Sequence, residues 1–337
     1  MTRELPIPDF FDPDRVGELW RVPYQERAAQ ARAWAREQGI RRAVEDEHPL
    51  ALVLIDVQNT FCLPGFALYV GGTEGEGPVA DNRRLCLFIY RNLHRITSIT
   101  ATLDTHRSLQ VFHERFLVGP DGEHPAPMTQ VSAADVKSGR WRFHDNAAPA
   151  LGVTSEEGQR HLERYVESLE RRGKYELTIW PYHAMLGGAG HALVPAVEEA
   201  LFFHGIARET QPELVLKGEH PLTEAYSALG PEVQEGFEGA EKEGRKGDFL
   251  ALVRRHEGVY VAGQAKSHCL AWTVADWLEE LRAGAPEGIG RIRLLEDCTS
   301  PVVVPGAADF TAEADAAFRR FAEAGVALVR SDDPVVP

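Results

Sequence analysis

Four short apolar segments of this 337-residue chain each lead to a side chain that could do chemistry. The first ends at Asp56, the second at Asp104-Thr105-His106 and the third at Lys217, while the fourth runs through a small-residue turn to Cys269. A thiol can act as a nucleophile, a carboxylate can take its proton, and an ammonium can stabilise negative charge. If these groups meet, they are suited to covalent catalysis.

The Asp-x-His pair suggests a second kind of chemistry. Residues two apart in an extended segment point to the same side, so the Asp104 carboxylate and the His106 imidazole can meet one metal ion. A glycine-rich turn from Tyr182 onward holds two further histidines. Either His183 or His191 could complete such a site.

Each of these residues also has an ordinary explanation. Asp56 could be a turn former or a helix cap, and the Asp-x-His pair could be a surface turn. Cys269 could be a buried cysteine that behaves as a small hydrophobe. Lys217 is less easily explained, because lysine is rarely found at the mouth of a buried strand. Their convergence on one place, rather than any one of them alone, would indicate a site.

Hydrophobic periodicity predicts the elements that position these residues. Strands are expected at Pro49–Ile55, Ile96–Leu103, Pro212–Leu216, Val259–Gly263, Ile289–Leu295 and Val326–Val329. Helical patterns alternate with them, which indicates a three-layer α/β/α fold with a six-stranded, mostly parallel sheet. The carboxyl ends of parallel strands lie along one edge of such a sheet, where ligands bind. All four candidate groups are therefore expected at that edge.

Cys269 stands at the joint between a strand and a helix. Leu270, Val274 and Leu281 follow it at helical spacing, so the cysteine is expected at a helix N-terminus. The partial positive charge of that end favours a thiolate over a thiol. The sequence therefore predicts that the pKa of Cys269 is lowered from its usual value of about 8.5.

The chain is predicted to be one domain with two additions. Residues 1–48 form an N-terminal helical extension, residues 49–337 form the domain, and residues from about 107 to 175 form an insertion that could cover the site. The extension should pack on the body or on another subunit, and we expect a homo-oligomer, because it holds Trp20, Tyr24 and Trp34. Surface positions are expected for most of the histidines of the insertion, which are His113, His124, His144 and His161.

Composition excludes several classes of partner. The 51 acidic and 36 basic residues give a formal charge of −15 without a basic patch, so no nucleic-acid partner is expected. The four cysteines are far apart and form no Cys-x-x-Cys pair, which indicates neither a disulfide framework nor a thiolate zinc site. The first residues do not resemble a signal peptide, and no apolar run approaches the length of a membrane helix. We therefore expect a cytoplasmic protein without a membrane partner.

Ordered motifs along the chain resemble the isochorismatase-like cysteine hydrolase superfamily, and most closely its nicotinamidases. The motifs are Asp56-Val57-Gln58-Asn59-Thr60-Phe61, Asp104-Thr105-His106, Trp180-Pro181-Tyr182-His183, Lys217-Gly218 with Tyr226-Ser227, and Gly263-Gln264-Ala265-Lys266-Ser267-His268-Cys269. They cover most of the body of the chain.

The resemblance implies a role for each matching residue. The catalytic triad of the family matches Asp56, Lys217 and Cys269. The metal ligands of nicotinamidases match Asp104, His106 and His183. Aromatic residues that line the ring pocket match Phe61 and Trp180, and Tyr226 is a further candidate for substrate contact. The turn before the cysteine is expected to hold a cis peptide at Gln264-Ala265 and to present the oxyanion-hole N–H groups of Ala265 and Cys269.

Together these matches predict a metal-assisted amidohydrolase. It would cleave a small, heteroaromatic carboxamide such as nicotinamide to the acid and ammonia through a thioester, with one divalent ion of zinc, iron or manganese. The alternative enzymes are a metal-free N-carbamoyl or ureido amide hydrolase and an isochorismatase-type hydrolase. The alternative outside enzymes is a catalytically silent scaffold or binding protein. The insertion and departures from the nicotinamidase pattern at Thr60, Ala184 and Gly187 to His191 leave the substrate open.

Overall fold

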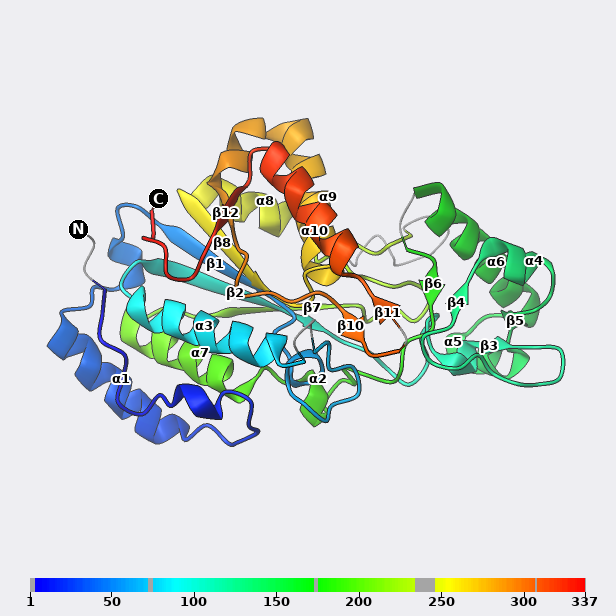
Figure 1. Cartoon of the computed structure of the whole chain (residues 1–337), viewed down its shortest axis with the longest axis horizontal. Coiled ribbons are helices and arrows are strands. Elements are labelled where there is room, and N and C mark those ends of the chain that lie inside the picture. The colour runs from blue at the N-terminus through cyan, green and yellow to red at the C-terminus, as the bar shows by residue number, and fades with distance from the viewer. Residues whose placement is uncertain (1–3, 72–74, 173–174, 234–245, 307, 337) are drawn as a thin grey trace.

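A six-stranded parallel sheet runs through the centre of the molecule in the computed structural model (Figure 1). The structure describes residues 4–71, 75–172, 175–233, 246–306 and 308–336. From edge to edge the strands are β12 (Ala327–Val329), β9 (Ile292–Leu295), β8 (Gly258–Gly263), β1 (Leu50–Ile55), β2 (Ile96–Asp104) and β7 (Glu213–Lys217). All neighbouring pairs are parallel, which confirms the predicted fold class.

Helices cover both faces of this sheet, so that three layers form (Figure 1). The helices on one face are α3 (Gly77–Arg91) and α7 (Pro195–Arg208), with α1 (Tyr24–Gln38) outside them. The helices on the other face are α8 (Lys246–Arg255), α9 (Cys269–Gly284) and α10 (Thr311–Glu323). The short elements near the carboxyl ends of the strands are α2 (Asn59–Cys62), β10 (Val303–Val304) and β11 (Ala308–Asp309).

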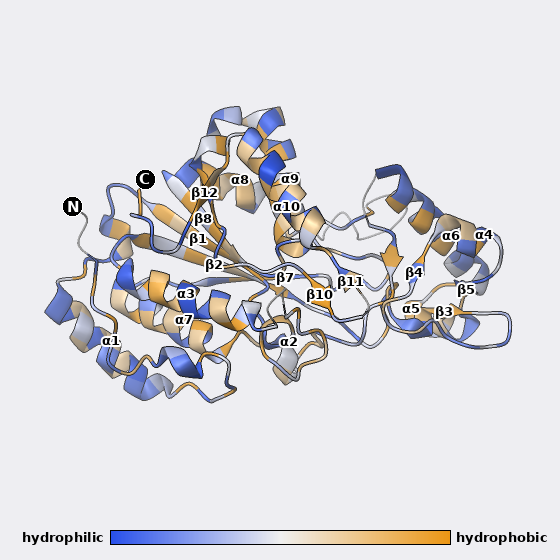
Figure 2. Ribbon diagram, in the orientation of Figure 1, coloured by the Kyte–Doolittle hydropathy of each residue, from blue (hydrophilic) through white to orange (hydrophobic). Residues whose placement is uncertain are grey.

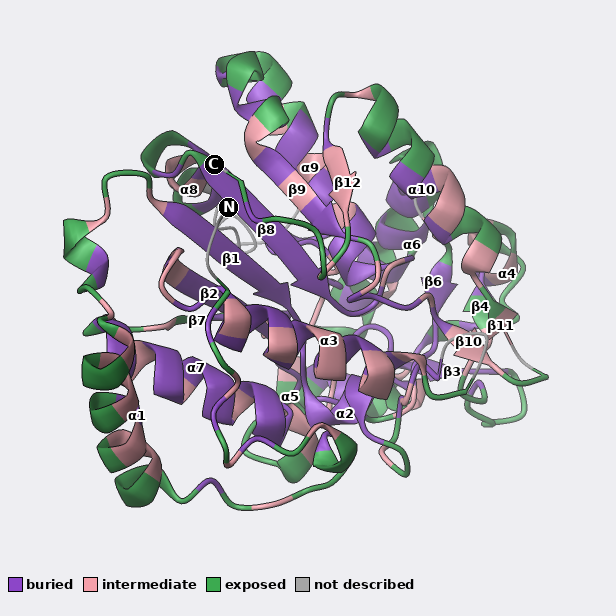
Figure 3. Ribbon diagram, turned by 60° about the vertical axis from the view of Figure 1, so that its left-hand side comes forward, coloured by how far each residue is buried: buried purple, intermediate pink, exposed green. Residues whose placement is uncertain are grey.

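The central strands are buried on both faces, as parallel strands between two helical layers must be. Every residue of β1 and of β8 is buried. Along β1, Leu50, Leu52 and Leu54 belong to the hydrophobic cluster on the α3 and α7 side, while the intervening residues belong to the cluster on the α9 side. Figures 2 and 3 show the result, with apolar, buried strands between helices whose outer surfaces are polar and exposed.

The N-terminal extension packs on the body of the same chain. The Trp34 and Phe203 ring centroids are 5.5 Å apart, and those of Tyr24 and Phe202 are 5.0 Å apart. Arg27 Nε donates to Glu199 Oε1 on α7 at 2.6 Å. The opposite face of α1 is exposed (Figure 3). The extension therefore fixes its aromatic residues against α7.

The predicted insertion forms a small lobe near the carboxyl end of the sheet (Figure 1). Its elements are β3 (Leu117–Val118), β4 (Gln130–Val131), α4 (Ala133–Lys137), β5 (Arg142–Phe143), α5 (Ala148–Leu151) and α6 (Ser155–Arg172). Two antiparallel pairs hold it together, β3 with β5 and β4 with β6 (Leu177–Thr178). Two of its histidines differ from the prediction: His113 is enclosed near the sheet edge, and His161 lies on the inner face of α6, so both are buried.

All six predicted strands are present, although the strand predicted from Ile289 begins only at Ile292, because Pro286–Arg291 form a 3-10 helix. Helix α3, which follows β1 in the chain, begins at Gly77. The reason is Pro78, which fits the first turn of a helix because that turn does not use its N–H groups. Within the ranges given above, no helix combines the length and apolar character needed to cross a bilayer.

Gly263 at the end of β8 provides a test of the sheet geometry. It has a φ of +117°, and a Cβ there would lie 2.1 Å from the Ile55 carbonyl oxygen. We expect Gly263→Ala to lower the free energy of unfolding by about 3 kcal/mol or more, because the overlap is with backbone atoms and no side-chain rotation relieves it.

Urea unfolding followed by circular dichroism measures this effect. The control is Gly284→Ala at the end of α9, where an added Cβ has no neighbour within 4 Å. An unfolding free energy for Gly263→Ala within about 1 kcal/mol of the parent, the usual range for surface changes, would contradict the described junction of β8 and β1.

Candidate active site

The strands that carry the candidate residues are neighbours, in the order β8, β1, β2 and β7. Asp56 directly follows β1, while Asp104 and Lys217 end β2 and β7 and are paired across them. Cys269 begins α9 after the turn that follows β8. The structure therefore brings together the residues that the sequence placed at one edge.

Lys217 is the centre of a buried cluster of charges. Its Nζ lies 2.9 Å from Asp56 Oδ2 and 3.1 Å from Asp104 Oδ1. The same nitrogen donates to the carbonyl oxygen of Ala225 at 2.8 Å and lies 3.6 Å from Cys269 Sγ. One ammonium thus contacts both carboxylates and the thiol.

Asp56 is held against β2. Thr102 Oγ1 donates to Asp56 Oδ1 at 2.6 Å and accepts the backbone N–H of Asp56 at 3.0 Å. Burial raises the pKa of this carboxyl, although the ammonium of Lys217 acts in the opposite direction. Asp56 is therefore a better proton acceptor than an ordinary surface carboxylate.

The thiol of Cys269 differs from the prediction. Burial raises its pKa well above the ordinary value, and the carboxylates of Asp56 and Asp104 add to this effect while Lys217 opposes it. The predicted lowering is therefore wrong, because the loss of water and two nearby negative charges outweigh the helix N-terminus. Cys269 is a neutral thiol at rest, and a base must take its proton before it can attack.

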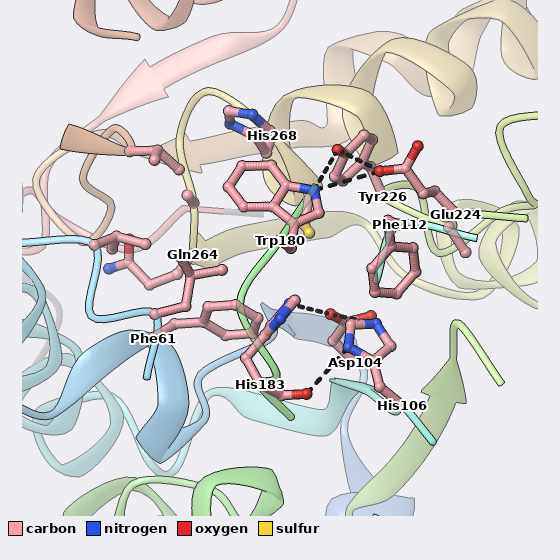
Figure 4. Close-up of a pocket in the computed structure, with 16 residues that line it drawn as sticks. Phe61, Asp104, His106, Phe112, Trp180, His183, Glu224, Tyr226, Gln264 and His268 are labelled. Atoms are coloured by element: carbon pink, nitrogen blue, oxygen red, sulfur yellow. Dashed lines mark hydrogen bonds and ion pairs between the residues drawn. The ribbon is translucent and has the colours of Figure 1, made fainter. Parts of the chain in front are cut away.

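Asp104, His106 and His183 form a second group beside Lys217 (Figure 4). Their ligand atoms all lie within 4.8 Å of one another, and all three side chains are buried. Asp104 Oδ2 lies 3.1 Å from His106 Nε2 and 3.7 Å from His183 Nε2. Although burial acts to raise it, the charges of His106 and Lys217 hold the pKa of Asp104 well below its usual value.

The surroundings of this group fit a divalent metal ion. His106 Nδ1 lies 3.2 Å from the His183 carbonyl oxygen, and His183 Nδ1 lies 2.7 Å from that of Pro181. A carbonyl only accepts, so each Nδ1 carries a proton, and each Nε2, which faces Asp104, would offer its lone pair to the ion. A Cβ at Gly218 would lie 2.8 Å from Asp104 Oδ1, so glycine keeps the space beside the ligand atoms open.

The structure distinguishes the two histidines that the sequence left open. His183 lies in the group with Asp104 and His106. His191 instead makes a hydrogen bond through Nε2 with Thr105 Oγ1 at 2.9 Å. His191 is thus a neighbour of the group and not part of it.

A small cavity of about 50 Å³ opens beside Cys269 and the three ligand residues. Phe61, Trp180 and Tyr226, the aromatic residues chosen from the sequence, all line it (Figure 4). Phe112 and His268 line it as well, although the sequence assigned no role to either. The nucleophile, the ligand group and an aromatic wall therefore share one cavity.

His268 presents a neutral ring to this cavity. Burial lowers its pKa to about 3. Its ring centroid lies 4.7 Å from those of Tyr175 and Phe310, and its Nδ1 lies 2.9 Å from Ser267 Oγ. His268 therefore contributes a flat, uncharged surface next to the nucleophile.

Glu224 is a buried carboxyl of the cavity wall that the sequence analysis missed. Its Oε1 accepts from Tyr226 Oη at 2.8 Å and from Trp180 Nε1 at 3.3 Å. Its Oε2 accepts from Tyr165 Oη of the insertion at 3.1 Å. The sequence gave only weak evidence for a site residue at Glu224, two residues before Tyr226, because a single acidic residue in a polar segment is usually solvated.

The turn before Cys269 has the expected cis peptide at Gln264-Ala265. The backbone N–H groups of Gln264, Lys266 and His268 donate to carbonyl oxygens. Those of Ala265 and Cys269 have no acceptor in the part of the chain that the structure describes. They are therefore free to bind an atom of a ligand.

The fold is similar to that of solved nicotinamidases. The yeast nicotinamidase Pnc1p aligns with 83% of this chain and 99% of its own at 17% identity and a TM-score of 0.51. Its complex with the inhibitor nicotinaldehyde aligns with a TM-score of 0.50 at the same identity and coverage. A nicotinamidase and pyrazinamidase from Acinetobacter baumanii aligns with 85% of this chain and 98% of its own at 17% identity and a TM-score of 0.49.

No protein-family model and no curated protein sequence matches the chain. The structural similarity to the yeast enzyme shows that the chain has the isochorismatase-like fold.

Glu224 gives a pH-dependent prediction for stability. Burial is the main cause that raises its pKa from 4.5 to about 8. Between these values the folded protein binds a proton that the unfolded chain has lost, so the free energy of unfolding falls as the pH rises. Glu224→Gln has no carboxyl group to deprotonate at this position. The free energy of unfolding of the variant, relative to that of the parent, should therefore increase steadily from pH 5 to pH 8.

Urea unfolding of both proteins at several pH values in this range tests the trend. Glu167→Gln, an exposed position of α6, is the matched control and should follow the parent at every pH. If the curves of Glu224→Gln and the parent are parallel, Glu224 does not take up a proton on folding.

Proposed function

We propose that this chain is a cysteine amidohydrolase that cleaves a small carboxamide to the acid and ammonia. One observation carries the proposal, namely that buried Lys217 Nζ joins Asp56 Oδ2 at 2.9 Å to Cys269 Sγ at 3.6 Å, next to the cavity that Cys269 lines. A base, an ammonium and a thiol in mutual contact are the groups that acyl transfer through a thioester requires. The fold shared with the yeast nicotinamidase supports this reaction class.

Acylation begins with the proton of the thiol. Asp56, whose pKa burial raises, takes the proton of Cys269, while the ammonium of Lys217 stabilises the thiolate that forms. The sulfur attacks the amide carbon, and the negative charge moves to the amide oxygen. The free N–H groups of Ala265 and Cys269 bind this oxyanion. Asp56 then gives its proton to the amide nitrogen, and ammonia leaves.

Deacylation reverses these roles. Water enters in place of ammonia, and Asp56 takes one of its protons as the oxygen attacks the thioester carbon. The same N–H groups hold the second oxyanion. When the carbon–sulfur bond breaks, Cys269 recovers its proton from Asp56 and the carboxylic acid is released. The cycle therefore consumes one water and regenerates both residues.

Asp104, His106 and His183 would hold a divalent metal ion at the side of the cavity. Zinc, iron and manganese all suit two imidazoles and one carboxylate. A bound ion would supply positive charge and a coordination position for a lone pair, such as that of a heteroaromatic ring nitrogen. The three residues would place that position next to the nucleophile.

The cavity favours a flat, aromatic amide. Phe61, Trp180 and Tyr226 offer ring surfaces, and Phe112 and His268 extend them. The cavity is small, which favours a small ligand. Nicotinamide, which is small and carries a ring nitrogen, is the first substrate to test.

Replacement of Cys269 tests the reaction class. Ammonia release is measured over nicotinamide, pyrazinamide, and N-carbamoyl and ureido compounds. We expect at least one to be hydrolysed, and Cys269→Ala to lower kcat by about 1,000-fold or more because the nucleophile is lost. Cys86→Ala, a buried cysteine of α3 outside the cavity, should retain parental activity.

The thioester provides a second measurement. Acid quenching during turnover should leave the acyl group on Cys269, visible by mass spectrometry of the intact protein and absent from Cys269→Ala. A parent protein that hydrolyses none of these compounds and forms no adduct would support a scaffold or binding role instead.

The two histidines near Asp104 provide a matched test of the metal. Bound metal is measured by elemental analysis after dialysis, and affinity by competition with a chelator. We expect His183→Ala to weaken binding by at least about 100-fold, since the loss of an outer-shell partner alone costs about 10- to 100-fold. His191→Ala, which changes a histidine outside the group, should bind like the parent.

A parent protein without metal that stays active after chelation would favour the metal-free amide hydrolases. Equal binding by the two variants would remove His183 from the ligand set.

A further inference from the structure

Asp81 is a buried carboxylate that the proposed reaction does not use. It lies in the second turn of α3, is 2% exposed, and does not line the cavity. A carboxylate is costly to bury unless it is hydrogen-bonded. Its partners therefore indicate what it does.

Asp81 joins two segments through one oxygen. Its Oδ2 accepts from Gln264 Nε2 at 2.9 Å and from Ser300 Oγ at 2.6 Å. Gln264 Oε1 in turn accepts the backbone N–H of Ser300 at 3.1 Å. Because the amide of Gln264 has a donor end and an acceptor end, these bonds fix its orientation. Arg84 Nη2 donates to the other oxygen of Asp81 at 2.8 Å.

Gln264 and Ser300 both lead directly to the oxyanion turn, which is the segment from Gln264 to Cys269. Gln264 forms the cis peptide with Ala265, whose N–H has no acceptor among the described residues. The carbonyl oxygen of Ser300 accepts the N–H of Lys266 at 2.8 Å. The turn is thus bonded to Asp81 directly through Gln264 and indirectly through Ser300.

The approach of α3 to this turn is tight. A Cβ at Gly77, the first residue of α3, would lie 2.4 Å from Ser300 Oγ. The helix can therefore reach Ser300 only because a glycine stands there. Asp81 presents its carboxylate to the turn from a rigid, closely packed element rather than from a loop.

On the basis of the amide hydrolysis proposed above, we propose that Asp81 is a positioning residue of this site, which fixes the oxyanion turn through Gln264 and Ser300. Hydrogen bonds to a charged acceptor are shorter and stronger than neutral ones, so a carboxylate holds both donors firmly. The N–H groups of Ala265 and Cys269 then have a fixed direction before the substrate binds. Preorganised donors of this kind act mainly on the transition state.

The test replaces Asp81 by leucine, which has a similar size and accepts no hydrogen bond. We expect Asp81→Leu to lower kcat by about 10- to 100-fold with KM within about threefold. Complete loss of one oxyanion donor lowers kcat by about 100- to 1,000-fold, and a displaced turn would weaken the donors without removing them. Asp81→Asn keeps one acceptor oxygen and should recover most of the loss. Arg83→Ala, which changes a side chain of the same helix that contacts Pro13 and Asp14, is the matched control and should keep kcat within about twofold.

An aldehyde analogue of the hydrolysed amide gives a readout that a purely structural role would not move. The thiol of Cys269 adds to the aldehyde carbon, and the former carbonyl oxygen lies where the oxyanion forms. Asp81→Leu should weaken inhibition by the aldehyde about as much as it lowers kcat, while substrate KM stays nearly constant. If Asp81→Leu does not fold, Ser300→Ala serves as a milder change in the same network. It should also lower kcat and weaken aldehyde inhibition at nearly constant KM, but to a smaller degree.

The outcomes separate this inference from the proposed function. If the parent hydrolyses an amide but Asp81→Leu and Ser300→Ala change only thermal stability, Asp81 is a structural residue and the function stands. If the parent hydrolyses no amide, the function and this inference both fail. A lower kcat, weaker aldehyde inhibition and recovery by Asp81→Asn together establish the positioning role.

Discussion

The contact of the Lys217 ammonium with Asp56 and Asp104 is the interaction on which the site depends. All three charges are buried, and an isolated buried charge costs several kcal/mol. Each charge is therefore tolerated only while the other two stay within reach. Because the three residues end or follow the neighbouring strands β1, β2 and β7, this requirement also fixes where those strands stop relative to one another.

The same contact couples two kinds of chemistry. The Lys217 ammonium contacts Asp56 and Cys269, and it also contacts Asp104 of the ligand group. A change of charge at the ligand group would therefore change the electrostatic environment of the thiol, because both contact the same ammonium. Electrostatic interactions are strong at these short distances between buried groups. In the proposed mechanism a thiol that is neutral at rest would be activated by this arrangement, since Asp56 and Lys217 are already in contact.

The sequence was sufficient to predict what depends on local pattern. Apolar runs gave all six strands of the sheet, and their ends gave Asp56, Asp104, Lys217 and Cys269, because strand ends in a parallel sheet share one edge. The cis peptide at Gln264-Ala265 followed from the resemblance. The roles of these residues remain predictions that the experiments above test.

The remaining features depend on contacts between distant segments, which no local pattern records. Asp81 looks like a solvated residue of a helix that contains three arginines, and only the approach of Ser300 and Gln264 shows that it is buried. The pKa of Cys269 was predicted in the wrong direction for the same reason. The helix N-terminus was visible in the sequence, whereas the burial and the two carboxylates that dominate were not.

The insertion is hydrogen-bonded to the wall of the cavity. Its helix α6 reaches the cavity wall through two residues: Tyr165 bonds to Glu224, and His161 Nε2 donates to the carbonyl oxygen of Leu222 at 2.9 Å. Glu224 in turn holds the polar edges of Trp180 and Tyr226, so a shift of α6 would move two ring surfaces of the cavity. None of these contacts touches Asp56, Lys217 or Cys269. The reactive groups therefore lie at the carboxyl edge of the sheet, while two ring surfaces of the cavity wall are linked through Glu224 to α6 of the insertion.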